Sequence, residues 1–503
     1  MGRKKALFIN SVASLLQQLV ALICGLVVPR LILSTFGSSA NGTVASVTQF
    51  ISITSLIQGG ITGATRVAFY TPVATGDIYQ TSVVHKTSQS FFSRFALVLS
   101  GYVLLLAVFY PRCVDIPFSI REGFLLILTL GLNAIFEYLF GIANQLLLFA
   151  DLKGYINTFL QIICALMNAI VCVVLINAGC NLLMVKFISA LVFLLRPIAL
   201  HFYVRIKYSL DRTVNKNKKV LSHSNAALAK SIAFYVHSST DTMVITACLD
   251  VMWVSVYAVH RYVISSISNL VSAILGNTEA LFGQMIARKE DDLIKKEVPL
   301  YDLMSKMLST IFFFTCMILI TPFIDLYTGG VTDIDYYQPL FAMLLCAAEF
   351  VYCTSLTYNN MIMAAGHIKE TKWISITEAL INILCSFLLV GKIGIIGVAL
   401  GTFLAFVFNT VANIIYMRKH IFMISLMWVV KSYISNIMAG LVSMLVVWNF
   451  VDYQVESYFG FFIYAMLVFT VVVVIDIFVN TVFFGENIRQ IMKKVFLKFS
   501  KKN

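Results

Sequence analysis

Long apolar stretches alternate with short polar segments along the whole sequence. A helix needs about 20 mostly apolar residues to cross the hydrocarbon core of a bilayer. The pattern predicts about fourteen such helices, with ends defined to within several residues. The expected ranges are 8–30, 43–65, 91–111, 124–148, 156–177, 183–204, 227–248, 253–281, 304–325, 339–362, 373–391, 394–416, 427–449 and 460–483. The segments 43–65 and 253–281 are rich in Ser, Thr, Gly and Gln, so we expect them to line a polar interior.

Composition indicates a protein that is dissolved in lipid. Hydrophobic residues occupy 59% of the 503 positions, charged residues occupy 12%, and the mean hydropathy is +0.88. Because soluble domains carry about 25% charged residues, we expect no soluble domain of useful size in this chain. The ten cysteines form no CxxC pair, so we interpret them as small packing residues and expect no metal site.

Basic residues predict the orientation of the helices. The net charge is +13, and Lys and Arg gather in alternate short segments, a distribution typical of membrane topology rather than of nucleic-acid binding. By the positive-inside rule, both termini are expected in the cytoplasm. The basic residues that precede the first helix, follow the sixth and fill the tail are Arg3, Lys4, Lys5, Arg205, Lys207, Arg212, Lys216, Lys218, Lys219, Arg489, Lys493, Lys494, Lys498, Lys501 and Lys502. The acidic residues of two opposite loops are Asp325, Asp333, Asp335, Asp452 and Glu456.

A weak internal repeat divides the chain. A shift of 214 residues sets Asn168 on Asn382 and Arg205 on Lys419, and it sets predicted helices one to six on helices seven to twelve. Both halves start on the same side, so the repeat is parallel, and repeated transporters bind substrate between their halves. We therefore predict an all-α polytopic protein with an N-terminal lobe at 1–210, a C-terminal lobe at 211–425, and two further helices with a basic tail at 426–503.

Motifs for known enzyme chemistry are missing from the sequence. It contains no GxxxxGK[ST], no HExxH, no GxSxG and no paired-carboxylate motif in a plausible context. The predicted outer loops are too short to carry a catalytic site for a membrane polymerase or ligase. These observations favour transport over enzymology and predict no catalytic residue.

Four arginines are candidates for binding an anionic substrate. A charge in the middle of a spanning helix costs about 2.5–3.5 kcal/mol, so it needs a reason. Arg196 precedes Pro197 in mid-helix and Arg261 lies about two turns into a polar helix, which favours a functional interpretation of both. Arg30, at the outer end of the first helix, has a second interpretation as a snorkelling residue. Arg66, at the predicted cytoplasmic end of the second helix, has a second interpretation as a topological residue.

Acidic residues inside the helices are candidates for ion coupling. Glu137 and Glu349 lie near the middle of helices four and ten, 212 residues apart, and so are almost equivalent under the repeat. Each either balances an arginine in a structural ion pair or exchanges a proton. Asp241 follows His237 by one turn, which suggests either a proton relay or a packing histidine. Two further acidic residues, nearer the cytoplasmic ends, are interpreted as solvated or paired: Glu378 and Asp476.

The N-terminal pattern resembles a known family. Its elements are Asn10-Ser11, Pro29-Arg30, Gly37, Asn41-Gly42 and Gly59-Gly60 followed by Arg66. Their spacing is similar to the first two helices of the polysaccharide-transporter branch of the MATE/MOP superfamily, the Wzx-type O-antigen and exopolysaccharide flippases. Two positions depart from the family: Gln58 replaces a frequent acidic residue, and Asn41 stands where an aromatic often precedes the glycine.

The resemblance implies a fold and a substrate. It implies a MATE/MOP-like, V-shaped bundle of two six-helix lobes around a cationic cavity, in the bacterial inner membrane. The implied substrate is an undecaprenyl-pyrophosphate-linked oligosaccharide that moves from the cytoplasmic to the outer leaflet for O-antigen, capsule or exopolysaccharide synthesis. Arginine is the preferred partner of phosphate oxygens, so the four arginines fit such a head group. No cofactor is expected beyond coupling to H⁺ or Na⁺, and the expected partners are membrane lipids, a polysaccharide polymerase and a chain-length regulator.

Three alternatives remain at this stage. A multidrug or metabolite antiporter of the same superfamily would prefer cationic substrates and an acidic cavity. A membrane glycan polymerase or ligase would need a larger outer loop. A peptidoglycan-precursor flippase would share the mechanism and differ only in its cargo.

Overall fold

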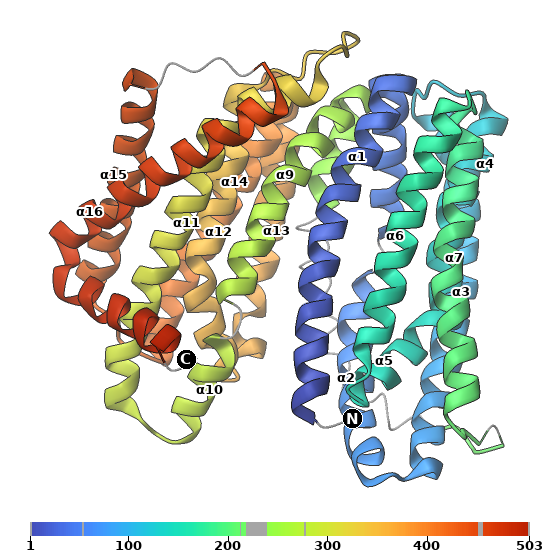
Figure 1. Cartoon of the computed structure of the whole chain (residues 1–503), viewed down its shortest axis with the longest axis horizontal. Coiled ribbons are helices and arrows are strands. Elements are labelled where there is room, and N and C mark those ends of the chain that lie inside the picture. Colours follow the sequence, from blue (N-terminus) through green and yellow to red (C-terminus); the bar gives the residue numbers. More distant parts are fainter. Residues whose placement is uncertain are drawn as a thin grey trace. The chain divides into compact units, whose positions relative to one another are not determined.

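The computed structural model describes residues 3–52, 55–211, 213–217, 239–275, 278–450 and 456–500, with side chains except those of 3–8, 55–60, 64, 280, 368, 492 and 494–500. All regular structure in these ranges is helical (Figure 1). Twelve of the described helices are long and apolar enough to cross a membrane. This confirms the predicted all-α, multi-spanning class, and part of the predicted helix 227–248 lies outside the described residues.

Packing divides the chain into two compact units. Unit 1 comprises Met1–Val256 with the short segment Gly330–Ile334, and unit 2 comprises Tyr257–Gly329 with Asp335–Asn503. This division lies after Val256, whereas the boundary inferred from the repeat lies at residue 210. The repeat remains a prediction about sequence similarity.

Unit 1 is an antiparallel helical bundle. Its helices are α1 (Arg3–Ile51), α2 (Ser55–Thr75), α3 (Ile78–Cys113), α4 (Ile120–Phe136), the π-helix η2 (Glu137–Gly141), α5 (Ile142–Ala150), α6 (Gly154–Asn177) and α7 (Leu182–Lys207). Helix α6 packs on α1 and α7, and α4 packs on α3 and α7. The start of α3 is fixed by Asp77, whose carboxylate accepts from the Gln80 N–H at 2.8 Å. A capping box between Ser119 and Glu122 starts α4.

The first two helices differ from the prediction. The ranges 8–30 and 43–65 were expected to be separate spans, but α1 continues to Ile51 and α2 ends only at Thr75. The polar stretch between the predicted spans leaves helical geometry only at Gly37, where φ is +82°. Gly37 has no Cβ and adopts this left-handed φ without steric cost. The polar residues after Gly37 stay helical because partners elsewhere in unit 1 satisfy their side chains.

The helix restarts directly after this break. The Ser38 N–H donates to Asp333 Oδ2 and the Ser38 hydroxyl donates to Asp333 Oδ1, each at 2.6 Å. Asp333 lies in the short segment 330–334, which belongs to unit 1 although the helices on both sides of it belong to unit 2. A carboxylate at this position satisfies a free backbone N–H and opposes the helix dipole.

Unit 2 is a second helical bundle. Its helices are α9 (Val251–Leu275, which begins in unit 1), α10 (Thr278–Ala287), α11 (Asp291–Thr328), α12 (Pro339–Ala364), α13 (Ile368–Ile393), α14 (Ile395–His420), α15 (Leu426–Phe450) and α16 (Tyr458–Ser500). Helix α14 packs on α12 and α13, and α11 packs on α12. The two helices that follow the predicted repeat, α15 and α16, pack on each other and on α11. They are thus an integral part of unit 2.

Candidate functional site

An ion pair at a π-helix marks the middle of unit 1. Arg196 of α7 places Nη2 2.7 Å from Oε2 of Glu137, the first residue of η2. The Gln145 amide donates to the other carboxylate oxygen. Gly141 leaves room for the carboxylate, because a Cβ there would lie 2.7 Å from the Glu137 carboxyl carbon. Single π-turns inside α-helices are rare and occur often at functional sites.

Polar side chains satisfy the backbone of this π-turn. The Gln89 amide donates to the carbonyl of Leu139, and Asn144 Nδ2 donates to the carbonyl of Phe140 at 2.6 Å. Asn144 Oδ1 lies 3.0 Å from His85 Nε2. Backbone groups inside a membrane need internal partners, and α3 and α5 supply them here.

The same side chains line a cationic cavity in unit 1. The cavity has a volume of about 570 Å³ and lies between α3, α5, α7 and the segment that follows α7. Basic or imidazole groups outnumber acids in its lining, where Asp211 is the carboxylate. The basic and imidazole residues are His85, Lys86, His201, Arg205 and Lys216. Such a lining favours an anion over a cation.

The segment after α7 closes one side of this cavity. The Lys216 ammonium donates to Ser90 Oγ at 2.7 Å, and the Asp211 N–H donates to Ser82 Oγ at 2.9 Å. The sequence analysis assigned Arg205 and Lys216 to topology alone. A charge count along the chain gave no indication that they face the imidazoles of α3 and α7.

A smaller polar cluster ends α5 and α7. Asp151 accepts from the Tyr208 hydroxyl and lies 2.7 Å from Lys153 Nζ. Burial raises the pKa of Tyr208 well above its usual range, and the hydrogen bond to Asp151 raises it further. Burial lowers the pKa of Lys153, but the contact with Asp151 outweighs it, so that this pKa is raised. Tyr208 therefore remains a neutral donor, and Lys153 remains charged.

Arg66 lies in the middle of α2. The prediction that it ends a helix at residue 65 is wrong, because α2 runs on through Pro72 to Thr75. The Arg66 guanidinium carbon lies 4.0 Å from the centre of the Phe149 ring, and its buried Nε has no hydrogen-bond acceptor. It forms no ion pair with any described residue. The aromatic ring holds the guanidinium and leaves buried donor capacity unused.

A second intramembrane ion pair lies in unit 2. Arg261 of α9 donates through Nη1 to Oε1 of Glu349 in α12. The Glu349 side chain is 4% exposed and the Arg261 side chain is 26% exposed. The two acids of the repeat thus each balance an arginine, as one of the predicted interpretations had it. Ion coupling through either acid remains a prediction.

The remaining predicted residues are less defined. Arg30 is half-buried in α1, seven residues before the Gly37 break. Asp241 is buried in the short helical segment that follows the undescribed part of the chain. His237 lies outside the described residues, so the proton relay with Asp241 remains a prediction.

The residues that carry the family resemblance serve packing in unit 1. A Cβ on Gly42 would lie 1.8 Å from the carbonyl oxygen of Val251, so only glycine lets α1 approach the start of α9 this closely. Asn41 Nδ2 donates to Ser255 Oγ at 2.7 Å in the same contact. Asn10 donates to a backbone carbonyl in the turn after α5. These motif residues therefore stabilise the fold.

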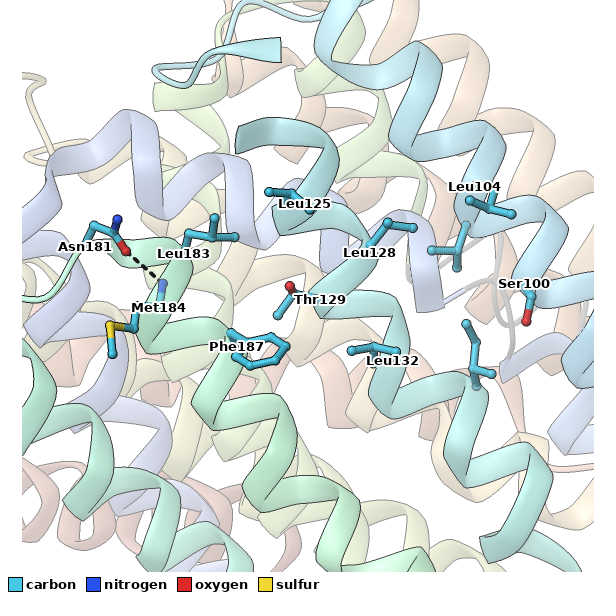
Figure 2. Close-up of a pocket in the computed structure, with 12 residues that line it drawn as sticks. Ser100, Leu104, Leu125, Leu128, Thr129, Leu132, Asn181, Leu183, Met184 and Phe187 are labelled. Atoms are coloured by element: carbon cyan, nitrogen blue, oxygen red, sulfur yellow. Dashed lines mark hydrogen bonds between the residues drawn. The ribbon is translucent and has the colours of Figure 1, made fainter. Parts of the chain in front are cut away.

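An apolar cavity of about 610 Å³ also lies in unit 1, between α3, α4 and α7. Figure 2 shows Leu104, Leu125 and Phe187 around this space, while Asn181 turns to the first turn of α7, where Oδ1 accepts from the Met184 N–H at 2.9 Å. Because the apolar side chains are about half-exposed in helices that can span a membrane, this surface fits hydrocarbon and not a charged head group.

Sequence reasoning missed a buried ion pair in unit 2. The predicted span 304–325 put Lys306 at a helix end, but α11 begins at Asp291 and Lys306 lies four turns inside it. Lys306 Nζ donates to Asp302 Oδ2 at 2.9 Å, to the Tyr358 hydroxyl at 2.9 Å and to Ser432 Oγ at 2.7 Å. The i, i+4 spacing of Asp302 and Lys306 was the available signal.

Comparison with known proteins gives the fold but no close relative. No protein-family profile and no curated protein sequence matches the chain. Among solved structures, the lipid II flippase MurJ in an inward closed conformation is similar over 95% of this chain and 98% of its own, with a TM-score of 0.71 and 14% identity. An inward-facing multidrug resistance MATE family transporter of the MOP superfamily is similar over 80% of this chain and 94% of its own, with a TM-score of 0.66 and 13% identity.

These likenesses define the architecture as that of MOP-superfamily transporters. An outward-facing MATE transporter of the same superfamily also matches, over 83% of this chain and 95% of its own, with a TM-score of 0.60 and 12% identity. At such identities the likeness shows a shared fold, and the MATE/MOP-like part of the fold prediction is confirmed.

Proposed function

We propose that this protein is a flippase for a lipid-linked oligosaccharide. Its cargo carries a pyrophosphate between a polyprenyl tail and a sugar chain, and alternating access moves the head group from the cytoplasmic to the outer leaflet. The glycan then serves surface polysaccharide synthesis. The protein performs transport and no covalent chemistry.

The stacked arginine of unit 1 carries this proposal. Arg66 is held against Phe149, has a buried Nε without an acceptor and lacks a carboxylate partner among the described residues. A guanidinium in this state is prepared for a planar, bidentate contact with phosphate oxygens. Arg196 and Arg261, by contrast, already balance glutamates.

The extent of the structural likeness also favours a flippase. The MurJ structure matches 95% of this chain and the inward-facing MATE transporter 80%, a difference of about 75 of the 503 residues. That number is close to the size of the segment 426–503, which contains α15 and α16. The chain therefore has the extent of a lipid-linked flippase rather than that of a drug antiporter.

The charge of the cavity in unit 1 argues in the same direction. Five basic or imidazole groups against one carboxylate favour an anionic head group and disfavour a cationic drug. The apolar cavity and the exposed leucines and phenylalanines leave the lipid tail in the bilayer while the head group crosses. We place the protein in the bacterial inner membrane with both termini in the cytoplasm, beside a polysaccharide polymerase and a chain-length regulator.

Complementation with matched arginine variants tests the proposal. In a strain that lacks its own O-antigen or capsule flippase, the wild-type gene should restore surface glycan. Arg66→Ala should reduce the restored glycan at least tenfold at equal membrane abundance, because a phosphate contact of about 1.5–3 kcal/mol is lost. Arg66→Lys should restore part of it, because it keeps the charge without the planar fork.

Arg288→Ala is the control, because Arg288 is exposed and its nearest carboxylate, on Glu290, lies 3.9 Å away. Full glycan with Arg66→Ala would show that this arginine is not the phosphate site. Resistance to cationic drugs in a pump-deficient strain, without any glycan restoration, would instead support the antiporter.

A further inference from the structure

A buried carboxylate without a counter-charge lies in α16. The Asp476 side chain is fully buried, at 0% exposure. Its Oδ1 accepts one hydrogen bond, from Asn480 Nδ2 at 3.1 Å, and its Oδ2 has no hydrogen-bond partner. The sequence analysis interpreted Asp476 as solvated or paired near a cytoplasmic end, and the structure shows that this is wrong.

Amide and hydroxyl groups join Asp476 to the neighbouring helices. Asn480 and Asn436 of α15 exchange hydrogen bonds of 3.3 Å in both directions, and the Ser435 hydroxyl donates to Asn480 Oδ1 at 3.0 Å. Thr310 of α11 donates to Asn436 Oδ1 at 3.3 Å. This polar cluster therefore lies where α11, α15 and α16 meet, inside the membrane-spanning part of unit 2.

The charges along these helices do not balance at Asp476. It is the one charged residue of the sequence from Tyr458 to Gly485, and Lys306 is the one charged residue from Leu303 to Ile324. The ammonium of Lys306 spends its three donors on Asp302, Tyr358 and Ser432.

Helix α15 does not supply the missing charge. Its one charged residue is Lys431, whose Nζ donates to the Phe483 carbonyl at 2.9 Å and lies over the Phe484 ring. Tyr433, the titratable hydroxyl of α15, donates to Thr354 Oγ1 at 3.1 Å. The described neighbours thus leave Asp476 with a net charge of −1 whenever it is ionised.

We propose that Asp476 is a proton-binding site of the transport cycle, with the proton held on the partnerless Oδ2. An ionised carboxylate buried without a counter-charge costs several kcal/mol, which a bound proton removes. Sodium fits less well, because hard cations need a shell of oxygen ligands and the group bonded to the carboxylate is an amide N–H. Loss of the proton leaves a bare charge between α15, α16 and α11 and so favours an arrangement in which water reaches it.

A hydrophobic carbodiimide tests proton binding directly, because it forms a stable adduct with protonated carboxyls in apolar surroundings. The full-length protein in nanodiscs is treated with dicyclohexylcarbodiimide over a pH series, and the adducts are mapped by mass spectrometry. We expect labelling of Asp476 that falls as the pH rises, no label at that position in Asp476→Asn, and little label on the ion-paired Glu349. No label on Asp476 at any pH would overturn the proposal.

Salt arms separate a proton from a sodium ion. Labelling at fixed pH should be equal in sodium chloride and choline chloride, and protection by sodium alone would overturn the proton assignment. Asp476→Glu should still be labelled, and the infrared band of a protonated carboxyl should be present in wild type and absent from Asp476→Asn. These readouts need no substrate.

The role in transport rests on the proposed function and needs its own arm. In proteoliposomes, an imposed pH gradient should accelerate movement of a lipid-linked oligosaccharide by wild type and have no effect with Asp476→Asn. An unchanged response in Asp476→Asn would overturn the transport role. If labelling is found but no lipid-linked oligosaccharide moves with wild type, the proposed function fails while the proton site stands.

Discussion

Glu137 and Glu349 lie 212 residues apart at almost equivalent places of the two halves, and each balances an arginine inside a spanning helix. The arginines come from helices that are not equivalent, because Arg196 is in α7 and Arg261 is in α9. The acids thus follow the repeat and the cations do not. A carboxylate at this place is the shared feature of the two units, and each unit neutralises it in its own way.

The pair in unit 1 should be needed for stability. Both side chains are mostly buried, at 11% exposure for Glu137 and 20% for Arg196. Glu137→Gln leaves Arg196 without its counter-charge and should destabilise the protein by about 3–5 kcal/mol, whereas Glu137→Gln with Arg196→Met should recover much of this loss. Thermal melting in detergent, followed by size exclusion, measures the difference. A double variant no more stable than the single one would show that the pair does not act as a unit.

Gly42 should tolerate no side chain. A Cβ at this position would lie 1.8 Å from the Val251 carbonyl oxygen, and two backbone segments would have to separate to admit it. Gly42→Ala should therefore cost at least the 1–3 kcal/mol of a typical overpacked site, approximately, and lower the amount of folded protein. Gly63 in α2 is the control, since a Cβ there meets nothing within 4 Å.

Gly63→Ala should leave stability unchanged or raise it by about 0.5–1 kcal/mol, because alanine restricts the unfolded chain. Equal melting temperatures for Gly42→Ala and Gly63→Ala would refute the close approach of α1 to the start of α9.

Hydropathy alone predicted most of the fold, because a spanning helix satisfies its own backbone and needs only length and apolarity. It failed where distant residues decide the structure. The stretch after residue 30 looked like a loop, yet Ser38 and Asn41 stay in α1 because Asp333 and Ser255 accept their hydrogen bonds.

The candidate site was predictable in part for the same reason. Four arginines and three acids could be chosen by their positions, and two of the resulting pairs, Arg196 with Glu137 and Arg261 with Glu349, are present. Lys306 and Asp476 escaped notice because their partners lie on other helices more than forty residues away for Ser432 and Asn436 respectively. A single sequence does not show which helices pack together.

The carboxylate of Asp333 should stabilise the restart of α1. It accepts both the backbone N–H and the hydroxyl of Ser38 directly after the Gly37 break. Asp333→Ala removes both bonds and should cost about 0.5–2 kcal/mol, the range of a lost helix cap. The exposed Asp335, which accepts from the Tyr337 N–H, provides the control.

Hydrogen–deuterium exchange on the wild type and the two variants locates the effect. Asp333→Ala should speed exchange in residues 38–41 of α1, whereas Asp335→Ala should leave that peptide unchanged. Unchanged exchange in Asp333→Ala would mean that the helix restart does not depend on this carboxylate.

Lys306 should behave as the central ion of a buried network and not as a surface lysine. Lys306 and Asp302 are fully buried, and the lysine also bonds Tyr358 of α12 and Ser432 of α15. Lys306→Met leaves Asp302 as an unbalanced buried charge and should cost about 3–5 kcal/mol, whereas Asp302→Leu with Lys306→Met should restore a large part of it. Lys295→Met at an exposed site of the same helix should change stability by no more than about 0.5 kcal/mol. If Lys306→Met melts at the temperature of Lys295→Met, the network does not hold α11, α12 and α15 together.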